Sequence, residues 1–540
     1  MRIGIAIDLG TSGFRAQKID LETGQIQKTV ITMRNPLPGA NIMDHLDFAI
    51  TYGLEKAHGL VINTILNIIN RLGVEPELVE RISVCGNPIQ LSIFQGIPID
   101  DLAYAGERKK QKLNIKEQKR ESMIVKSDEI EGLEVFKNAT VVIPPAIKHE
   151  IGADALALIV NSGLLETDEY AIATDFGTNA EMALSANGVI YTGSAAAGPA
   201  LEGQEISCGV LASPHVISDV DFEGDYIRCY VLDENMDKQK GDLVNPKNGE
   251  IIEKNDVRAR GITGTGVIAL IEQGISNGII TLPHINTPDK IIHLQDNITF
   301  NEKDVEEAGN AIGAIRAGHM SLCAAAGISV EDLKISHMSG ASGTYMDAFK
   351  AYKIGMNPYN VDLITQIGNT SLKMAREILL SEERLKELQD IANKIVGTHV
   401  MFATDPVFKE IYILEIAYWG EGMNFKMFKK FLKKKELPMI DEPLNTPKID
   451  KKVEKDIPDF GVEGLESIKR TGTYLAMKVE NPEASEWIKA CPTHAMSYKD
   501  GFVKIRSDLC DGSNCKKCTR TFPPEVFSWD LLEVTEPELT

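Results

Sequence analysis

The chain has 540 residues, of which 43% are hydrophobic and 25% are charged, and its formal net charge is −21. This length predicts two or three domains, and the acidic balance argues against a nucleic-acid binder because no basic excess can neutralise phosphates. No apolar run approaches the roughly 18 residues that span a bilayer, and the first residues lead into a strand rather than a signal peptide. We therefore expect a cytoplasmic protein without a membrane partner.

The first predicted element is a strand that ends in an acid and a glycine-rich turn. Ile3, Ile5 and Ile7 lead to Asp8, and residues 14–19 alternate like a returning strand. The phrase recurs later, where Thr174-Asp175-Phe176-Gly177-Thr178-Asn179-Ala180 matches Ile7-Asp8-Leu9-Gly10-Thr11-Ser12-Gly13. Aspartate at a strand end can hold Mg²⁺ through water, and a glycine turn offers N–H groups to phosphate oxygens. A plain β-turn would explain one copy, but two matched copies predict hairpins that grip one nucleoside triphosphate from both sides.

Helices and strands alternate through the first predicted lobe, residues 1–165. Apolar side chains between Leu54 and Ile68 recur at helical spacing. Strands are predicted at residues 81–84, just before Gly86-Asn87-Pro88, and at residues 141–143. The polar stretch 106–121 is interpreted as a solvated excursion. This alternation predicts an α/β unit.

The second predicted lobe, residues 166–437, opens with a strand at 170–174 and the repeated turn. Glycine-rich segments follow at 193–203, 261–266 and 340–343. A helix predicted at 304–323 contains many small residues, which normally lower helix propensity; they are Ala308, Gly309, Ala311, Gly313, Ala314, Ala317 and Gly318. Such residues allow two backbones to approach closely. This approach is expected either at a crossing between domains or within a tightly packed core.

The character of the chain changes near Pro438, after a predicted helix that carries Phe425, Phe428 and Phe431. Prolines among charges predict a linker over residues 438–470, followed by a small module at 471–540. Four of the eight cysteines lie in this module, and the other four are scattered and interpreted as small buried hydrophobes; these are Cys85, Cys208, Cys229 and Cys323. This distribution does not indicate a disulfide framework.

The clustered cysteines have the spacing of metal ligands. Cys491-Pro492 is followed by Cys510-x4-Cys515-x2-Cys518, and Phe522 stands where a bacterial-type ferredoxin would have a further Cys-Pro cysteine. In such ferredoxins each cluster takes three close cysteines of one motif and the Cys-Pro cysteine of the other. The four cysteines present therefore belong to a single cluster, and we predict one [4Fe–4S] centre. Structural zinc on the same four thiolates is the main alternative, and a redox-active thiol pair is another.

Several longer stretches resemble a known family. They are Ile7 to Arg15, Asp175 to Met182, Gly193 to Ala200, Gly340 to Gly343, Met43 to Phe48 and Cys85 to Gln90. Over its whole length the chain is similar to the ATP-dependent reductive activators of corrinoid proteins, in particular the type that serves methylamine methyltransferases in methanogenic archaea. The hairpins alone would fit any member of the actin, sugar kinase and Hsp70 superfamily, whereas the combination is specific.

The resemblance implies a two-lobed actin-like (ASKHA) α/β core with ATP between the lobes, followed by a small α+β ferredoxin-like module. It implies that Asp8 and Asp175 position Mg²⁺ and the attacking water. The residues expected around the nucleotide are Gly10, Thr11, Ser12, Gly13, Gly177, Thr178, Asn179, Gly340, Ala341, Ser342 and Gly343, with Gly264, Thr265 and Gly266 lining the same cleft. The cluster ligands would be Cys491, Cys510, Cys515 and Cys518.

The activity implied by the resemblance is the reduction of Co(II) to Co(I) in the corrinoid protein of a methyltransferase system. ATP would offset the low cobalt potential, and a low-potential donor would supply the electron through the cluster; the protein would be a monomer or homodimer. Activators of this type carry two clusters, whereas this chain can ligate one, so the electron route is shorter, the donor differs, or the chain is a paralogue with another partner. The alternatives are a small-molecule kinase of the same superfamily with a structural zinc module, and a non-catalytic adaptor of corrinoid proteins.

Overall fold

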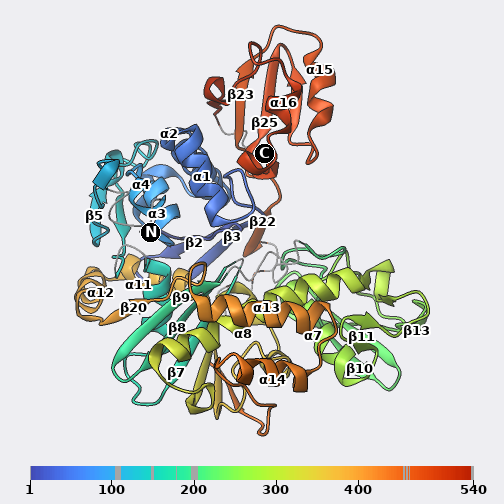
Figure 1. Ribbon diagram of the computed structural model, residues 1–540. Helices are drawn as coiled ribbons and strands as arrows, with labels where there is room; N and C mark the ends of the chain where they lie inside the picture. The colour runs from blue at the N-terminus through green and yellow to red at the C-terminus, as the bar shows by residue number, and fades with distance from the viewer. Residues whose placement is uncertain are drawn as a thin grey trace. The chain divides into compact units, whose positions relative to one another are not determined.

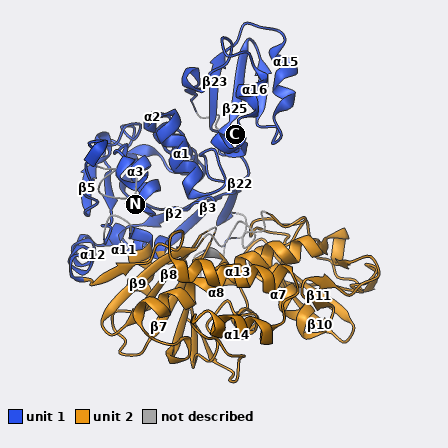
Figure 2. Ribbon diagram, viewed as in Figure 1, with its two compact units in different colours: residues 1–154, 371–394, 456–540 blue, residues 155–370, 395–455 orange. Residues whose placement is uncertain are grey.

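The structure is a computed structural model that describes residues 2–103, 111–147, 151–177, 179–195, 205–453, 457, 460 and 463–536. It has two compact units (Figure 2). Unit 1 comprises residues 1–154, 371–394 and 456–540, and unit 2 comprises residues 155–370 and 395–455. Among the described residues, no helix has both the length and the apolar character needed to cross a membrane.

Unit 1 is built on a seven-stranded sheet with the order β22-β3-β2-β1-β4-β6-β5 (Figure 1). The first three strands form an antiparallel meander, and β4 and β6 continue the sheet in parallel with β1. The strands are β1 (Ile3–Leu9), β2 (Phe14–Asp20), β3 (Ile26–Thr32), β4 (Val79–Gly86), β5 (Met123–Lys126), β6 (Thr140–Ile143) and β22 (Leu465–Ile468). The predicted hairpin and the strands predicted at 81–84 and 141–143 are therefore confirmed.

The helices of unit 1 include the one predicted from apolar spacing, now α2 (Leu54–Arg71), whose Ala57, Val61 and Ile65 are buried. The others are α1 (Ile42–Tyr52), α3 (Pro88–Gln95), α4 (Asp100–Ala103), α11 (Thr370–Leu380) and α12 (Glu382–Lys394). Part of the polar stretch 106–121 lies outside the described residues.

Residues 371–394 were expected in the second lobe, yet they pack with unit 1. Ser83 Oγ of β4 donates to the carbonyl of Ala375 at 2.6 Å, and Arg81 bonds Glu382 at 2.7 Å. The division of the chain thus differs from the predicted border at residue 165. Contacts between segments distant in sequence decide it, and local patterns do not report such contacts.

Unit 2 also contains a seven-stranded sheet, and its arrangement resembles that of unit 1. Its order is β20-β9-β8-β7-β18-β19-β21. Again an antiparallel meander is followed by parallel strands, so the duplicated phrase reflects a duplicated fold. The strands are β7 (Ala171–Phe176), β8 (Ala180–Ala186), β9 (Val189–Ala195), β18 (Ile335–Ser339), β19 (Leu363–Gly368), β20 (Gly397–His399) and β21 (Lys448–Lys451).

A second sheet of unit 2 is formed by β10 (Ile217–Glu223), β11 (Tyr226–Leu232), β12 (Lys238–Val244) and β13 (Ile251–Glu253). Two short hairpins, β14 (Ile280–Thr281) with β15 (His284–Ile285) and β16 (Ile291–His293) with β17 (Thr299–Asn301), complete its strands within the described residues. Its helices are α6 (Ala153–Ser162), α7 (Gly264–Ser276), α8 (Glu302–Ala326), α9 (Gly340–Tyr345), α10 (Ala348–Lys353), α13 (Pro406–Gly420) and α14 (Phe425–Lys434).

The helix rich in small residues, α8, lies in the core of unit 2, where α13 packs on it. A Cβ on Gly309 would lie 2.6 Å from Cβ of Trp419, and one on Gly313 would lie 2.7 Å from Cβ of Glu415. Of the two explanations offered for the small residues, close packing within a core holds for these contacts, since both helices belong to the same unit.

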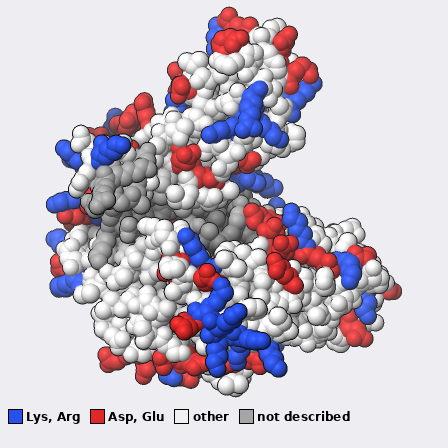
Figure 3. Space-filling model, in the orientation of Figure 1, with Lys and Arg blue, Asp and Glu red and all other residues white. Residues whose placement is uncertain are grey.

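Helix α14 has a buried apolar edge, with Phe428 and Leu432 inside, and an opposite face rich in lysine. Figure 3 shows Lys and Arg side chains gathered over this part of unit 2, on a chain that is otherwise strongly acidic. The amphipathic pattern explains the helix without any ligand.

The expected linker, residues 438–470, contributes a strand to each of the two large sheets. β21 pairs with β19 in unit 2, and β22 pairs with β3 in unit 1. The C-terminal module, residues 471–536, is an antiparallel sheet of order β24-β25-β23-β26 with two short helices (Figure 1). Its elements are β23 (Tyr474–Lys478), α15 (Ala484–Trp487), β24 (Met496–Lys499), β25 (Phe502–Arg506), α16 (Lys517–Thr521) and β26 (Glu533–Val534).

Candidate nucleotide and metal sites

The hairpin of unit 1 requires glycine at both ends of its turn. A Cβ on Gly10 would lie 2.7 Å from the carbonyl oxygen of Gly13, and one on Gly13 would lie 2.5 Å from the carbonyl oxygen of Thr32. Between the two glycines, Thr11 and Ser12 are half-buried. Asp8 is also half-buried and lies opposite Cys85 of β4 in the sheet register. The predicted residues of this hairpin are thus gathered at one end of β1.

Polar contacts from neighbouring segments hold this turn. Asn35 Nδ2 donates to the carbonyl of Gly10 at 3.0 Å, and the Phe14 N–H donates to Thr32 Oγ1 at 2.8 Å. Asn87, which caps α3, places its Nδ2 3.5 Å from Thr11 Oγ1. The backbone N–H groups of a turn fixed in this way are suited to bind an anion.

The matching hairpin of unit 2 places Asp175 at the carboxyl end of β7. Ser339, directly opposite on β18, has its Oγ 2.9 Å from Asp175 Oδ2. The next residue, Gly340, has a φ of +91°, and a Cβ there would lie 2.4 Å from Asp175 Oδ1. Glycine is required at this position because the backbone conformation and the carboxylate both exclude a side chain.

The helix α9 starts at Gly340 and contacts both β7 and β18, which brings two predicted segments together within unit 2. Gly177, Asn179, Ser342 and Gly343 lie at this carboxyl end of the sheet. Thr178 lies outside the described residues, and nothing is described of the side chain of Ala341.

The third glycine segment of unit 2 is used in packing. Gly264, Thr265 and Gly266 form the first turn of α7 and are buried. Thr265 Oγ1 donates to the carbonyl of Ser218 at 3.0 Å, and a Cβ on Gly266 would lie 2.7 Å from the carbonyl oxygen of Ile217. The close approach of α7 to β10 thus accounts for Gly-Thr-Gly, although α7 also contacts α9.

The four clustered cysteines line one pocket of the C-terminal module, which we call the cysteine pocket; its lining includes Cys491, Thr493, Met496, Ile505, Cys510, Cys515, Cys518 and Trp529. Burial, reinforced by the neighbouring thiols, raises the pKa of Cys510 to about 12, and burial also raises the pKa of Cys518. Such thiols stay protonated unless a cation compensates the negative charge of the thiolates.

The described residues contain no group of three or more His, Cys, Asp or Glu side chains arranged to hold a metal ion. The four thiols therefore share a pocket without standing in coordinating positions. The pocket nevertheless fits an iron–sulfur cluster in its chemistry. Its donors are four cysteines, and the indole N–H of Trp529, which is 4% exposed, lies against Cys518 and favours the thiolate form of that residue. Cluster sulfurs accept such N–H groups.

The scattered cysteines do not join this pocket. Cys85, Cys229 and Cys323 are buried, as predicted, whereas Cys208 is half-buried. Burial raises the pKa of both Cys229 and Cys323 to about 12, which keeps these thiols neutral.

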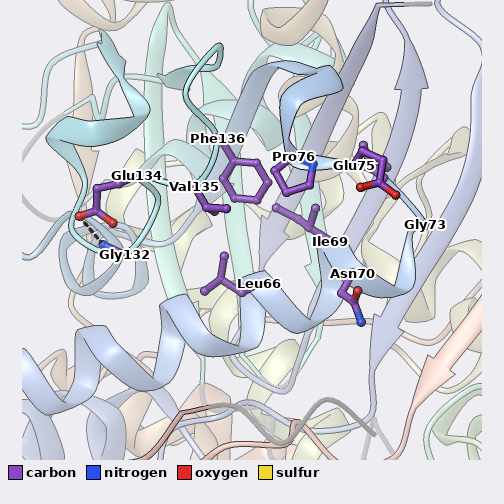
Figure 4. A pocket seen from close by; sticks show the side chains of 11 residues that line it. Leu66, Ile69, Asn70, Gly73, Glu75, Pro76, Gly132, Glu134, Val135 and Phe136 are labelled. Atoms are coloured by element: carbon purple, nitrogen blue, oxygen red, sulfur yellow. Dashed lines mark hydrogen bonds between the residues drawn. The ribbon is translucent and has the colours of Figure 1, made fainter.

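Another pocket of unit 1, of about 450 Å³, lies at the end of α2 (Figure 4). Leu66, Ile69 and Phe136 form its apolar wall, and Glu134 accepts the N–H of Gly132 at its edge. None of the predicted site residues lines it.

Comparisons with known proteins place the whole chain in one family. Residues 3–167 match the family model described as the RACo middle region, and residues 169–429 match the C-terminal domain of RACo, the ASKHA domain. The [Co(II) methylated amine-specific corrinoid protein] reductase of Methanosarcina barkeri is 47% identical over 517 residues, which cover 95% of each chain. This chain is a reductive activator of corrinoid proteins.

One further relative of this activator agrees with the assignment, and one solved structure shares its fold. The corrinoid activation enzyme RamQ of Eubacterium limosum is 25% identical over 439 residues, covering 78% of this chain and 71% of that protein. A solved reductive activator for a corrinoid, iron–sulfur protein aligns with a TM-score of 0.62 at 23% identity, over 77% of this chain and 66% of that protein. The predicted family and the ASKHA fold are therefore confirmed.

Sequence reasoning about the activator missed the side chains that support its predicted sites. Asn35, Asn87, Ser339 and Trp529 were not predicted to act there. Asn87 carried a signal, because it lies in the Gly86-Asn87-Pro88 break after a predicted strand. The other three gave none, since each contacts a segment distant in sequence.

Proposed function

We propose that this activator couples ATP hydrolysis to a one-electron reduction of Co(II) to Co(I) in the corrinoid protein of a methyltransferase system. The name of its 47% identical relative, a reductase of a Co(II) corrinoid protein specific for methylated amines, supports a substrate of this class and a place in methanogenesis. The balance is one electron from a low-potential donor to cobalt, with ATP and water converted to ADP and phosphate.

In this proposal the two hairpins bind ATP and Mg²⁺. Asp8 and Asp175 position the metal ion and the attacking water, because each carboxylate stands at a strand end beside a glycine turn. The N–H groups of residues 10–13 and 177–179 face the phosphates, and residues 340–343 lie beneath the adenosine. Gly264, Thr265 and Gly266 support the site through α7 rather than through contact with nucleotide.

Cys491, Cys510, Cys515 and Cys518 would hold one [4Fe–4S] cluster, which supplies the one-electron step when it is bound. The observation that carries this assignment is that four cysteines from separate stretches line a single pocket beside the buried indole N–H of Trp529, which favours the thiolate form of Cys518. The surrounding ferredoxin-like module would exclude water and fix the thiolates.

ATP is required in this scheme because the cobalt couple has a very low potential. Each mismatch of about 59 mV in a one-electron step costs a factor of ten in the equilibrium. Domain closure around a nucleotide is a known way of changing a bound partner's geometry. If closure favours a cobalt geometry that is easier to reduce, the difference in potential between the donor and the cobalt couple becomes smaller.

The cluster assignment is tested by metal analysis of anaerobically prepared protein. We expect about four iron and four sulfide per chain, as the Cys₄ ligand set requires. Cys515→Ala should lose the cluster and the reduction of Co(II), whereas Cys208→Ala, a half-buried cysteine outside the pocket, should keep both. Zinc in place of iron would exclude the redox role and favour the kinase alternative.

The nucleotide assignment is tested by Asp175→Ala, with ATP turnover and Co(II) reduction measured in the presence of the corrinoid protein. We expect both to be lost while iron content is unchanged. Reduction that continues without ATP turnover would contradict the coupling.

Two further measurements use the unmodified protein. Binding of the corrinoid protein without ATP turnover or Co(II) reduction would indicate an adaptor. Gel filtration would distinguish a monomer from a homodimer.

A further inference from the structure

Residues 33–41, here called the bridging loop, connect β3 to α1 and touch both predicted sites of unit 1. Near its start, Asn35 Nδ2 donates to the carbonyl of Gly10 at 3.0 Å in the phosphate hairpin. Near its end, the N–H of Gly39 donates to the carbonyl of Cys510 at 2.8 Å in the cysteine pocket. Only three residues separate these two anchor points. A displacement at one of the two sites therefore reaches the other through a very short stretch of chain.

The bridging loop is held rigidly between its anchors. The N–H of Leu37 donates to Asn35 Oδ1 at 2.9 Å, and the residues from Asn35 to Pro38 are buried. Pro38 packs against Gly512, where an added Cβ would lie 3.3 Å from Cβ of Pro38. A buried and internally bonded loop transmits a shift, whereas a solvated loop would absorb it.

Helix α1 adds a second connection next to the first. Asp44 Oδ2 accepts the N–H of Ala40 at 2.8 Å, and Asp44 Oδ1 accepts Asn514 Nδ2 at 2.6 Å, one residue before Cys515. A Cβ on Gly39 would lie 2.2 Å from Cβ of Asp44, so this contact leaves no room for a side chain. The loop and α1 thus hold the backbone at Cys510 and the side chain of Asn514, which precedes Cys515.

The first turn of α1 is also tied back toward the hairpin through α3, because His45 directly follows Asp44. His45 is fully buried, and its Nδ1 lies 2.9 Å from Gln90 Nε2. Gln90 lies in the first turn of α3, whose cap Asn87 contacts Thr11. Two independent lines of contact therefore join the same pair of sites.

We propose that Asn35 is a positioning residue that couples occupancy of the phosphate hairpin to the state of the metal centre. This inference rests on the proposed function and adds the route by which nucleotide and cluster affect one another. Binding of phosphate to the N–H groups of residues 10–13 moves the carbonyl of Gly10, and Asn35 passes this movement to the backbone around Cys510. Docking of the C-terminal module alone would not require a bond to the hairpin.

Because coupling between two sites is reciprocal, it is measured most directly as a ratio of affinities. The test determines the Kd of a non-hydrolysable ATP analogue for the oxidised and for the dithionite-reduced full chain. We expect the two values to differ by about fivefold or more, at the lower end of known couplings. The electron paramagnetic resonance spectrum of the reduced cluster should also change when the analogue is added.

The decisive variant is Asn35→Asp, which keeps Oδ1 as acceptor for Leu37 and removes the N–H that bonds Gly10. We expect the affinity ratio to fall below about twofold, and the spectral change to disappear, with iron content unchanged. The matched control is Asn63→Asp. Asn63 Nδ2 donates to the carbonyl of Thr535 at 2.8 Å and so docks the same module away from the bridging loop. This control should keep the full ratio.

A second variant, Asn514→Ala, tests the other end of the route and replaces Asn35→Asp if that protein fails to fold. This variant should retain iron, and its Kd for the ATP analogue should become nearly the same in the oxidised and the reduced protein. An unchanged ratio in the folded, iron-loaded variant would overturn the inference, as would a ratio of one in the unmodified protein. Absence of iron or of nucleotide binding in the unmodified protein would overturn the proposed function itself, and these failures are separately visible.

Discussion

The two hairpins occupy the same place in two sheets of the same order, but different neighbours support them. In unit 1 the turn is held by Asn35 and Asn87, which come from segments outside the sheet. In unit 2 the carboxylate of Asp175 is held by Ser339 on the adjacent strand. The duplication preserved the strands and the turns, while the contacts around them diverged. The first hairpin is connected to the C-terminal module through Asn35. In the second hairpin the neighbouring strand holds the carboxylate of Asp175.

The sharpest contrast lies at the glycine at the carboxyl end of the parallel strand beside each hairpin, which is Gly86 at the end of β4 and Gly340 directly after β18. A Cβ on Gly86 would lie 2.9 Å from the carbonyl oxygen of Leu9, and one on Gly340 would lie 2.9 Å from that of Phe176. Leu9 and Phe176 hold the same position in the duplicated phrase. Only Gly340 also combines a φ of +91° with a Cβ position 2.4 Å from Asp175 Oδ1.

The largest predicted effect therefore follows from Gly340→Ala. We expect a loss of about 3–4 kcal/mol in the free energy of unfolding, because backbone strain and overpacking add. Gly86→Ala should cost about 1–2 kcal/mol, since it has the steric contact alone. Urea denaturation midpoints of the two variants measure the difference. Equal losses would show that the two positions are equivalent after all.

A second effect, of intermediate size, concerns acid stability. Burial lowers the pKa of His319 to about 3 and that of His337 to about 4 in unit 2, and the pKa of His45 to about 4 in unit 1. The unfolded chain takes up these protons first, near pH 6.5, so the stability from each neutral histidine is lost as the pH falls from about 6.5 toward its folded pKa.

Between pH 6.5 and 5 this loss amounts to about 2 kcal/mol for each histidine. Of these three histidines, two lie in unit 2 and one lies in unit 1. On acidification, unit 2 should therefore lose its protection against hydrogen exchange first. Hydrogen exchange of β18 and β4 at pH 7 and pH 5 measures the order. His319→Gln should reduce the acid sensitivity of unit 2 and leave that of unit 1 unchanged, and an unaltered sensitivity would contradict this account.

The smallest effect is predicted for Ser339→Ala, which removes the hydroxyl contact to Asp175. We expect a loss of about 1 kcal/mol in stability, because the hydroxyl has one proton to donate, although its oxygen also lies 3.0 Å from the carbonyl of Gly368 and 3.1 Å from Thr370 Oγ1. ATP turnover should fall more than stability does, because the carboxylate loses a support on one side. The control is Ser336→Ala. Ser336 also lies on β18 but donates its hydroxyl hydrogen to Asn357, so its loss should affect stability only. Equal turnover in both variants would remove Ser339 from the site.

Much of this molecule could be predicted from local patterns, and the exceptions share one cause. The duplicated phrase, the helix at 54–68 and the scattered buried cysteines follow from spacing and burial within one segment. By contrast, the edge strand β22, the membership of residues 371–394 and the role of Asn35 depend on partners far away in the chain. Cysteine spacing predicted which four residues share a pocket, but Trp529 stands outside the cysteine motifs, so spacing could not place it there.

The edge strand β22 has a consequence for how the protein is made. Leu465 of β22 pairs with Thr29 of β3, and Ile468 pairs with Thr32. The edge of β3 that faces away from β2 therefore stays unpaired until more than four-fifths of the chain has been synthesised. An uncovered strand of this kind invites pairing with other chains. Nascent activator would therefore depend on chaperones to shield its first sheet until translation reaches the final strands.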